Sequence, residues 1–93
     1  MSSVDGLGVA LGFIKSLQPK VQAQIARKIF ALGDDPHPHD SAPLKGYEDL
    51  LRFDCGEYRI IYRFVEAQDR VEIILLGKHN DDEVYKELKR HMG

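Results

Sequence analysis

Two stretches with apolar residues at helical spacing open the chain. Within residues 7–17, and again within residues 19–32, apolar side chains recur every three or four positions, which is the spacing of one face of an α-helix. Pro19 suits the first turn of a helix, and Gly33 suits the end of one. Because the connection between the two stretches is short, we expect an antiparallel helical hairpin at the N-terminus.

Three later stretches favour β-structure. Residues 49–54 and 57–65 flank a tight turn at Cys55-Gly56, and residues 71–76 follow a second turn. Short runs of this kind, rich in aromatic and β-branched residues and separated by turn signals, are typical of β-hairpins. We therefore expect a three-stranded antiparallel meander.

The alternation of side chains assigns the two faces of this sheet, because successive residues of a strand point to opposite sides. The face expected to pack on the helices carries Leu51, Phe53, Tyr58, Ile60, Tyr62 and Phe64. The opposite face carries Arg52, Arg59, Ile61 and Arg63. Three arginines on one face make it the candidate for anion binding.

Residues 80–93 carry the signals of a further helix. Asn80 can cap its beginning, and Glu83 follows three residues later, as in a capping box. Acidic residues come first and basic residues last, which suits the helix dipole. The pattern thus predicts an α+β fold with residues 1–93 as a single domain. It has an N-terminal helical hairpin packed on an antiparallel β-sheet of at least three strands, and a C-terminal helix.

The composition fits a globular protein that acts inside the cell. The 93 residues are 43% hydrophobic and 30% charged, which argues against disorder. No apolar run reaches the roughly 20 residues of a membrane span, and the N-terminus lacks the pattern of a secretory signal. The single cysteine, Cys55, fits a reducing compartment. We therefore expect a cytoplasmic protein without membrane contact.

The charge balance and the histidines limit the possible ligands. A formal net charge of −2 argues against strong non-specific binding to nucleic acid, which phosphate neutralisation drives. Any contact with RNA must then rest on a local basic face. Residues 34–43 are expected to form a loop, and its His37 and His39 have a spacing that fits no standard zinc pattern. We expect no metal and no cofactor.

Several short motifs follow one another in a definite order. They are Leu44-Lys45-Gly46, Arg52, the run Gly56-Glu57-Tyr58-Arg59-Ile60-Ile61-Tyr62, then Gly77-Lys78-His79 and Tyr85. In this order and at this spacing they resemble the RelE/ParE superfamily of toxins. That superfamily usually opens with a short edge strand before its first helix, and no convincing strand precedes the first helical stretch here.

The resemblance implies a two-helix layer on a curved antiparallel sheet and a role as the toxin of a type II toxin–antitoxin system. RelE-like members cleave messenger RNA in the ribosomal A site without a metal. The ribose 2′-hydroxyl attacks the adjacent phosphate, which leaves a cyclic phosphate and a free 5′-hydroxyl. The implied partners are a cognate antitoxin and mRNA in the ribosomal A site, with operator DNA contacted only through the antitoxin.

This reaction needs cations at the phosphate and groups that move protons. The planar guanidinium of Arg59, on a central strand, suits a phosphate, and the alternative is an ion pair with Asp54 or Glu72. By resemblance, we expect His79 to transfer protons near neutrality, and the alternative is a histidine that only finishes a strand. By resemblance, we expect Tyr85 to stack on or orient the substrate, and the alternative is plain packing. The expected catalytic residues are Arg52, Arg59, His79 and Tyr85, and the expected RNA-binding residues are Lys45, Arg63 and Lys78.

Two positions depart from the usual pattern of RelE-like enzymes. Leu50 stands where many of them have a lysine, and His79 stands where they often have an arginine. Two other functions therefore stay open. One is a ParE-like inhibitor of DNA gyrase, and the other is a catalytically degenerate module that binds its antitoxin and represses its own operon. Cys55, expected in a turn without a neighbouring histidine, is expected to be incidental.

Overall fold

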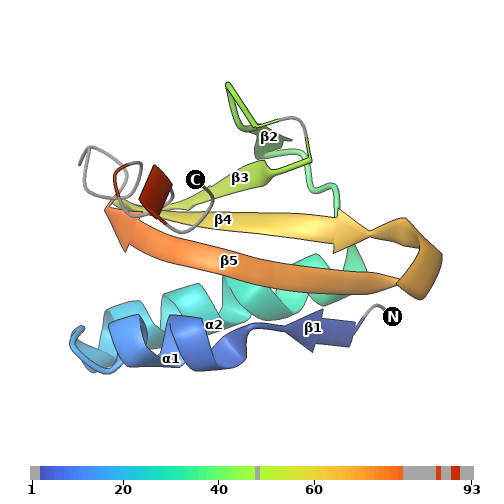
Figure 1. Cartoon of the computed structure of the whole chain (residues 1–93). Coiled ribbons are helices and arrows are strands. Elements are labelled where there is room, and N and C mark those ends of the chain that lie inside the picture. The colour runs from blue at the N-terminus through green and yellow to red at the C-terminus, as the bar shows by residue number, and fades with distance from the viewer. Residues whose placement is uncertain (1–2, 48, 79–85, 87–88, 91–93) are drawn as a thin grey trace.

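Five strands form one mixed β-sheet that carries two helices on one side (Figure 1). The computed structural model describes residues 3–47, 49–78, 86, 89 and 90, and only the backbone of residues 7, 9, 10 and 78. The strands are β1 (Ser3–Asp5), β2 (Ser41–Pro43), β3 (Leu51–Cys55), β4 (Tyr58–Val65) and β5 (Arg70–Lys78). The helices are α1 (Leu7–Ile14) and α2 (Pro19–Asp34), and a 3₁₀ turn, η1 (Glu66–Gln68), joins β4 to β5.

The strands β3, β4 and β5 form the predicted antiparallel meander. The turn between β3 and β4 is Gly56-Glu57, so the predicted turn at Cys55-Gly56 was wrong by one residue. Cys55 is the last residue of β3, and it pairs with Tyr58 across the hairpin. Gly56 has a φ of +60°, which suits the first position of a two-residue hairpin loop of type II′.

Two edge strands were not predicted, and the parallel pairing of one of them, β1, makes the sheet mixed rather than purely antiparallel. β1 pairs with β5 in parallel, and β2 pairs with β3 in antiparallel orientation. The expectation that no strand precedes the first helix was therefore wrong, and the last residues of the predicted loop over 34–43 belong to β2. Each of these strands has three residues, which is too short for an alternating pattern to reveal.

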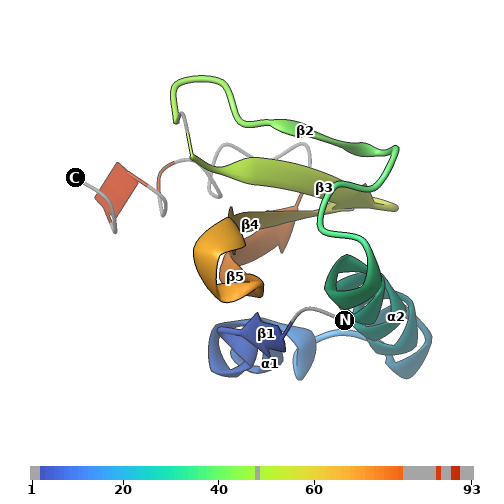
Figure 2. The same ribbon diagram turned by 90° about the vertical axis from the view of Figure 1, so that its right-hand side faces the viewer.

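The two helices lie next to each other under the sheet (Figure 2). α2 begins with proline at its first turn and buries a stripe formed by Ile25, Ile29 and Leu32. α1 begins after Gly6, whose φ of +82° is left-handed. A Cβ on Gly6 would clash with the carbonyl oxygen of Ile73, so this close approach to β5 requires glycine.

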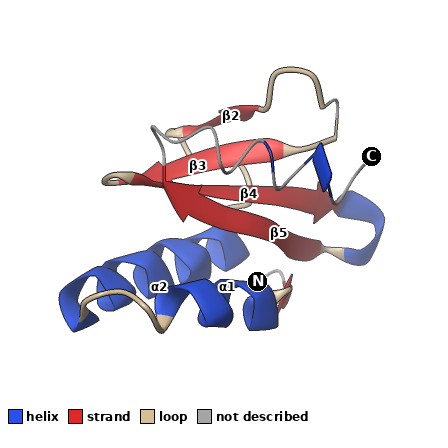
Figure 3. Cartoon of the chain, turned by 60° about the vertical axis from the view of Figure 1, so that its left-hand side comes forward, coloured by secondary structure: helices blue, strands red, loops and turns tan. Residues whose placement is uncertain are grey.

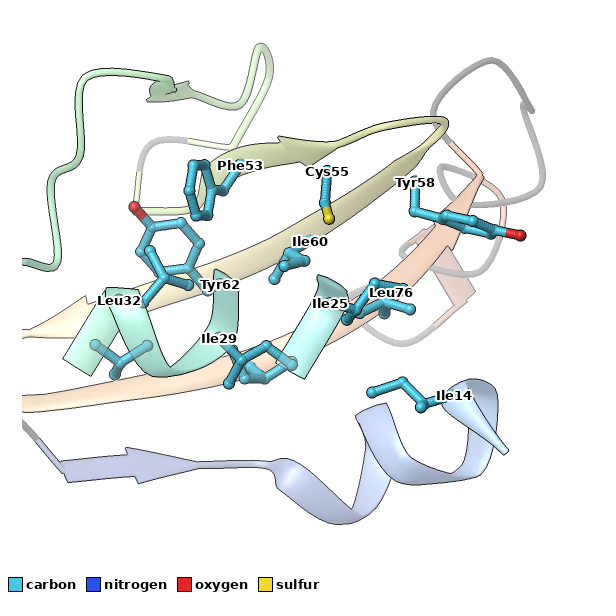
Figure 4. Close-up of a cluster of buried hydrophobic side chains, with 12 residues drawn as sticks. Ile14, Ile25, Ile29, Leu32, Phe53, Cys55, Tyr58, Ile60, Tyr62 and Leu76 are labelled. Carbon is cyan, nitrogen blue, oxygen red and sulfur yellow. The ribbon is translucent and has the colours of Figure 1, made fainter. Parts of the chain in front are cut away.

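The main core fills the space between the sheet and the helices. Figure 4 shows side chains of β3 and β4 pointing toward those of α2. The predicted parity is confirmed, because Phe53, Tyr58, Ile60 and Tyr62 are buried in this core and Leu51 and Phe64 pack against it. Tyr62 is fully buried, and its hydroxyl donates a hydrogen bond of 2.7 Å to the carbonyl oxygen of Pro36.

A second, smaller core lies on the opposite face of the sheet. The segment between β2 and β3 runs on the side away from the helices (Figure 3), and its Leu44 and Leu50 pack on Ile61 and Leu75. Leu50 is 0% exposed. At this position the side chain closes an apolar cluster, which accounts for a leucine where many RelE-like enzymes have a lysine.

The C-terminal part of the prediction lies mostly outside the described residues. The predicted helix over residues 80–93 includes three described positions, 86, 89 and 90, which are helical. His79 and Tyr85 lie outside the described residues, so their predicted roles stay predictions. Within the part of the chain that is described, no helix is long and apolar enough to cross a membrane.

Candidate functional site

Two arginines and one aspartate converge on the sheet face that points away from the helices. β3 and β4 are paired so that Asp54 lies directly across from Arg59 and Arg52 lies across from Ile61. Because side chains two residues apart share a face, Arg52 and Asp54 stand side by side on β3. The short Gly56-Glu57 turn fixes this register, and the predicted proximity of Arg52 and Arg59 follows from it.

The Asp54 carboxylate receives hydrogen bonds from both arginines. Arg59 donates from Nε to Oδ1 at 2.8 Å and from Nη2 to Oδ2 at 3.4 Å. Arg52 donates from Nη1 to Oδ2 at 3.2 Å. The paired contact of the Arg59 fork with two carboxylate oxygens is the geometry by which guanidinium groups also bind phosphate. The structure thus contains the Arg59–Asp54 ion pair that stood as the alternative to a phosphate role.

The site is partly shielded from water. The side chain of Arg59 is 12% exposed, whereas those of Asp54 and Arg52 are 31% and 33% exposed. An ion pair at this depth is screened less by salt than one on the open surface. We call Arg52, Asp54 and Arg59 the Asp54 group. The two arginines of this group are arranged to bind an anion, and the carboxylate of Asp54 occupies the position between them.

A second charged group lies farther along the same face. Arg63 donates to Glu72 through Nε at 3.1 Å and through Nη2 at 2.6 Å, and it also contacts Asp49 at 3.4 Å. Arg70 contacts both Glu72 and Asp5. The hydrogen bond from Arg63 is the main cause that lowers the pKa of Glu72 below its ordinary value of 4.5. These carboxylates hold the two arginines in fixed ion pairs.

The fully buried Ile61 separates the two charged groups. It lies between Arg59 and Arg63 on β4, and the second core covers it. Arg63 is therefore not brought together with Arg52 and Arg59, although all three share one face. Lys45 is exposed in the segment before β3, next to Gly46 with its φ of +90°. The backbone of Lys78 ends β5 and pairs with Tyr58 beside the hairpin turn.

The cations of the helical layer differ from those of the sheet. Arg52, Arg59, Arg63 and Arg70 of the sheet all form ion pairs. By contrast, no described carboxylate lies within ion-pair distance of Lys15, Lys20, Arg27 or Lys28. The ammonium of Lys28 lies 4.8 Å from the centre of the Phe53 ring, which is a cation–π contact. Among the described cations, those on or next to the two helices thus lack the carboxylate partners that the sheet arginines have.

The remaining candidates do not form a second site among the described residues. His37 is exposed and lies edge-on to the Phe64 ring, with centroids 5.5 Å apart. Within the described part of the chain, no group of three or more metal-ligating side chains occurs. Cys55 is buried, and burial raises the pKa of its thiol above 9.0, opposed by nearby Lys28. A thiol of this kind is a poor nucleophile near neutral pH.

Asp54 is the residue of this site that the sequence analysis did not assign a role beyond pairing. Its parity with Arg52 and its place two residues before a hairpin turn opposite Arg59 were visible signals. These signals alone do not place Asp54 between the two arginines, because that placement also needs the register of β3 on β4.

Comparisons with known proteins agree on one fold. A family model, described as the ParE toxin of the type II toxin–antitoxin system parDE, matches residues 10–83. A curated Escherichia coli protein classed as a RelE-like toxin is 27% identical over 73 residues, which is 76% of each chain. The crystal structure of isolated E. coli RelE toxin matches with a TM-score of 0.70 and 22% identity over 100% of both chains.

A second solved structure is an assembly with a partner. The archaeal RelE–RelB complex of Pyrococcus horikoshii OT3 matches with a TM-score of 0.73 and 24% identity. The match covers 85% of this chain and 96% of that one. At this level of identity the two structural matches establish the likeness of fold.

Proposed function

Because the chain belongs to the ParE toxin family of type II toxin–antitoxin systems, we propose that it is a RelE-like toxin that cleaves messenger RNA in the ribosomal A site. The observation that carries this proposal is the convergence of Arg52 and Arg59 on one point of a rigid sheet. Two preorganised cations at one point suit a phosphate whose negative charge grows in the transition state. The ribosome, in the cytoplasm, presents the RNA, so a net charge of −2 is no obstacle.

In the proposed reaction, the ribose 2′-hydroxyl loses its proton as its oxygen attacks the adjacent phosphorus, and the bond to the 5′-oxygen breaks as that oxygen gains a proton. Arg59 and Arg52 hold the phosphate oxygens, while His79 moves a proton to or from a reacting oxygen. The fold in this proposal has the N-terminal helical hairpin packed on the sheet and a C-terminal helix over residues 80–93. We propose that this C-terminal helix brings Tyr85 to the base. The products are a cyclic phosphate and a free 5′-hydroxyl, without metal.

The proposed RNA-binding residues lie around this centre and contact backbone phosphates. Lys45 and Lys78 belong to segments that flank β3 and β4. Arg63 lies beyond the second core from Arg52 and Arg59, and it is paired there with the carboxylate of Glu72. We therefore assign Arg63 a contact with a phosphate distant from the reacting one.

Primer extension on a defined message with translating ribosomes tests the proposal. The wild-type chain should produce cuts at in-frame A-site positions, and Arg59→Ala should abolish them. Arg59→Lys keeps the charge but loses the two-pronged contact, so it should cut weakly. The control is Lys15→Ala, which removes one exposed cation from the end of α1, away from the sheet face. Equal cutting by the wild-type chain and by folded Arg59→Ala would refute the proposal.

His79 is tested in the same assay. His79→Ala should lose most cleavage because the proton-transferring ring is gone, and His79→Arg should restore part of it through phosphate binding. Undiminished cleavage by His79→Ala would remove this residue from the mechanism.

A second candidate function is inhibition of DNA gyrase. Two observations favour it: the family model that matches is that of the ParE toxin, and Asp54 already pairs with Arg52 and Arg59. An inhibitor that acts by binding needs no catalytic set. Purified chain that blocks supercoiling by gyrase, and yields no cuts in the ribosomal assay, would establish this function instead of RNA cleavage.

The proposed partner in either case is a cognate antitoxin, as in the similar archaeal complex. The outward face of α2 supports a docking place. Lys20, Arg27 and Phe30 lie on it at helical spacing, and Phe30 is 66% exposed. A large exposed apolar ring on the same helix face as two unpaired cations suits an amphipathic acidic segment.

Two variants separate this docking surface from the general surface. Phe30→Asp should weaken binding of the cognate antitoxin by more than about tenfold, because it removes an aromatic anchor and adds repulsion. Ala67→Asp adds the same charge at an exposed position of η1 and should bind as the wild-type chain does. Titration calorimetry measures both. Equal affinities would contradict this docking place.

A further inference from the structure

The best phosphate-binding edge of Arg59 is already occupied. Its Nε and Nη2 atoms face the two oxygens of Asp54 at 2.8 and 3.4 Å. This edge of a guanidinium provides two parallel donors, and a phosphate uses it in the same manner as a carboxylate. An incoming phosphate must therefore displace Asp54 from this edge or take a less favourable approach.

The backbone holds Asp54 in this place. Asp54 and Arg59 are directly paired residues of β3 and β4, and the following pair, Cys55 and Tyr58, is buried in the main core. Arg52, on the same face two residues earlier, contacts Oδ2 of the same carboxylate at 3.2 Å. One carboxylate thus draws two guanidinium groups together and at the same time cancels one of their two charges.

We propose that Asp54 is a specificity-determining residue that occupies the anion seat between Arg52 and Arg59 and weakens the binding of free RNA. This inference rests on the proposed function only because it takes the two arginines as the phosphate-binding site. Asp54 positions both guanidinium groups. A phosphate that another macromolecule, such as the ribosome, holds in place displaces the carboxylate of Asp54. Free single-stranded RNA lacks that help and binds weakly.

The charges of the chain favour this arrangement. The sheet arginines all have carboxylate partners, and the whole chain has a net charge of −2. A protein that must avoid free RNA gains from such self-neutralisation, because non-specific affinity depends on the number of phosphates that its cations neutralise. The preference for a phosphate that is held in place over free RNA then comes from the need to displace the Asp54 carboxylate, rather than from tight binding.

The test is the binding of a short labelled single-stranded RNA without ribosomes, by fluorescence anisotropy at several salt concentrations. Asp54→Asn keeps the size of the side chain and removes its charge, so it should raise the affinity about tenfold, or about 1.4 kcal/mol. The slope of log K against log salt should steepen by about 0.7 for each phosphate newly neutralised. The control, Asp40→Asn, removes one exposed charge before β2 that pairs with none of the sheet arginines, and it should change neither quantity comparably.

A double variant assigns the gain to the arginine pair. Arg59→Ala in the Asp54→Asn background should abolish the increase in affinity. Equal affinity of Asp54→Asn and the wild-type chain, or an equal gain in Asp40→Asn, would overturn the proposal. So would a gain that survives the loss of Arg59. Because this assay contains no ribosome and no cleavage step, its result is independent of whether the chain cuts mRNA.

The wild-type chain allows a second measurement if Asp54→Asn fails to fold. Inorganic phosphate is titrated while the NMR signal of the Arg59 Nε–H is followed, with Arg59→Ala used to assign that signal. Because Asp54 accepts this donor, the signal should respond only weakly across a phosphate range that saturates an open arginine pair. A saturating shift at low phosphate would show an open seat and overturn the proposal.

Discussion

Truncation of Leu50 measures how much the second core contributes to stability. Leu50 is 0% exposed and packs with Leu44, Ile61 and Leu75. Leu→Ala changes at buried sites cost about 2–5 kcal/mol, depending on how far the surroundings collapse. Because a loop rather than a second sheet covers this cluster, the site can partly close, and we expect about 2–3 kcal/mol.

Urea unfolding followed by circular dichroism checks this value. With an m-value of about 1.5 kcal/mol/M, within the usual range for small proteins, Leu50→Ala should lower the midpoint by about 1.3–2 M. The matched control is Leu11→Ala on α1, where the side chain is 52% exposed and the loss should stay below about 0.5 kcal/mol. Equal midpoints for the two variants would refute the reasoning that Leu50 closes a core.

Three further predictions concern the backbone, an ion pair and a buried hydrogen bond. Gly6→Ala should lower the melting temperature because of its positive φ and close contact with β5, whereas Gly8→Ala, with open space around it, should not. Glu72→Gln should lower the melting temperature near neutral pH. That difference should vanish as the pH falls through the lowered folded-state pKa of Glu72, because protonation removes the wild-type ion pair with Arg63. Tyr62→Phe should lose about 0.5–1.5 kcal/mol in urea unfolding, since a buried hydrogen bond disappears.

The fold elements that the sequence predicted well are those with repeated signals. The alternation along β4 assigned both faces correctly because eight residues repeat the period of two. The three-residue strands β1 and β2 carry no such repeat, and their pairing depends on residues far along the chain. Gly6, directly after β1, has no room for a Cβ against the Ile73 carbonyl of β5, and this close approach is a tertiary condition that local pattern does not contain.

The candidate site was predictable where it depended on local pairing. Arg52 and Arg59 meet because a two-residue hairpin joins their strands. The separation of Arg63 was not predictable, because it depends on the segment that carries Leu50 folding back over Ile61. Parity places residues on a face, but only long-range packing decides which parts of that face remain open.

The distribution of ion pairs suggests a division of labour between the two sides of the molecule. Carboxylates neutralise the sheet arginines, so an anion must compete for them, whereas Lys20 and Arg27 on α2 have no described carboxylate partner. An acidic protein segment can bind the helical face without such competition. We therefore expect Phe30→Asp to lose antitoxin binding while it retains cleavage, and Arg59→Ala to show the reverse. If both variants lost both activities together, one shared surface would serve both partners.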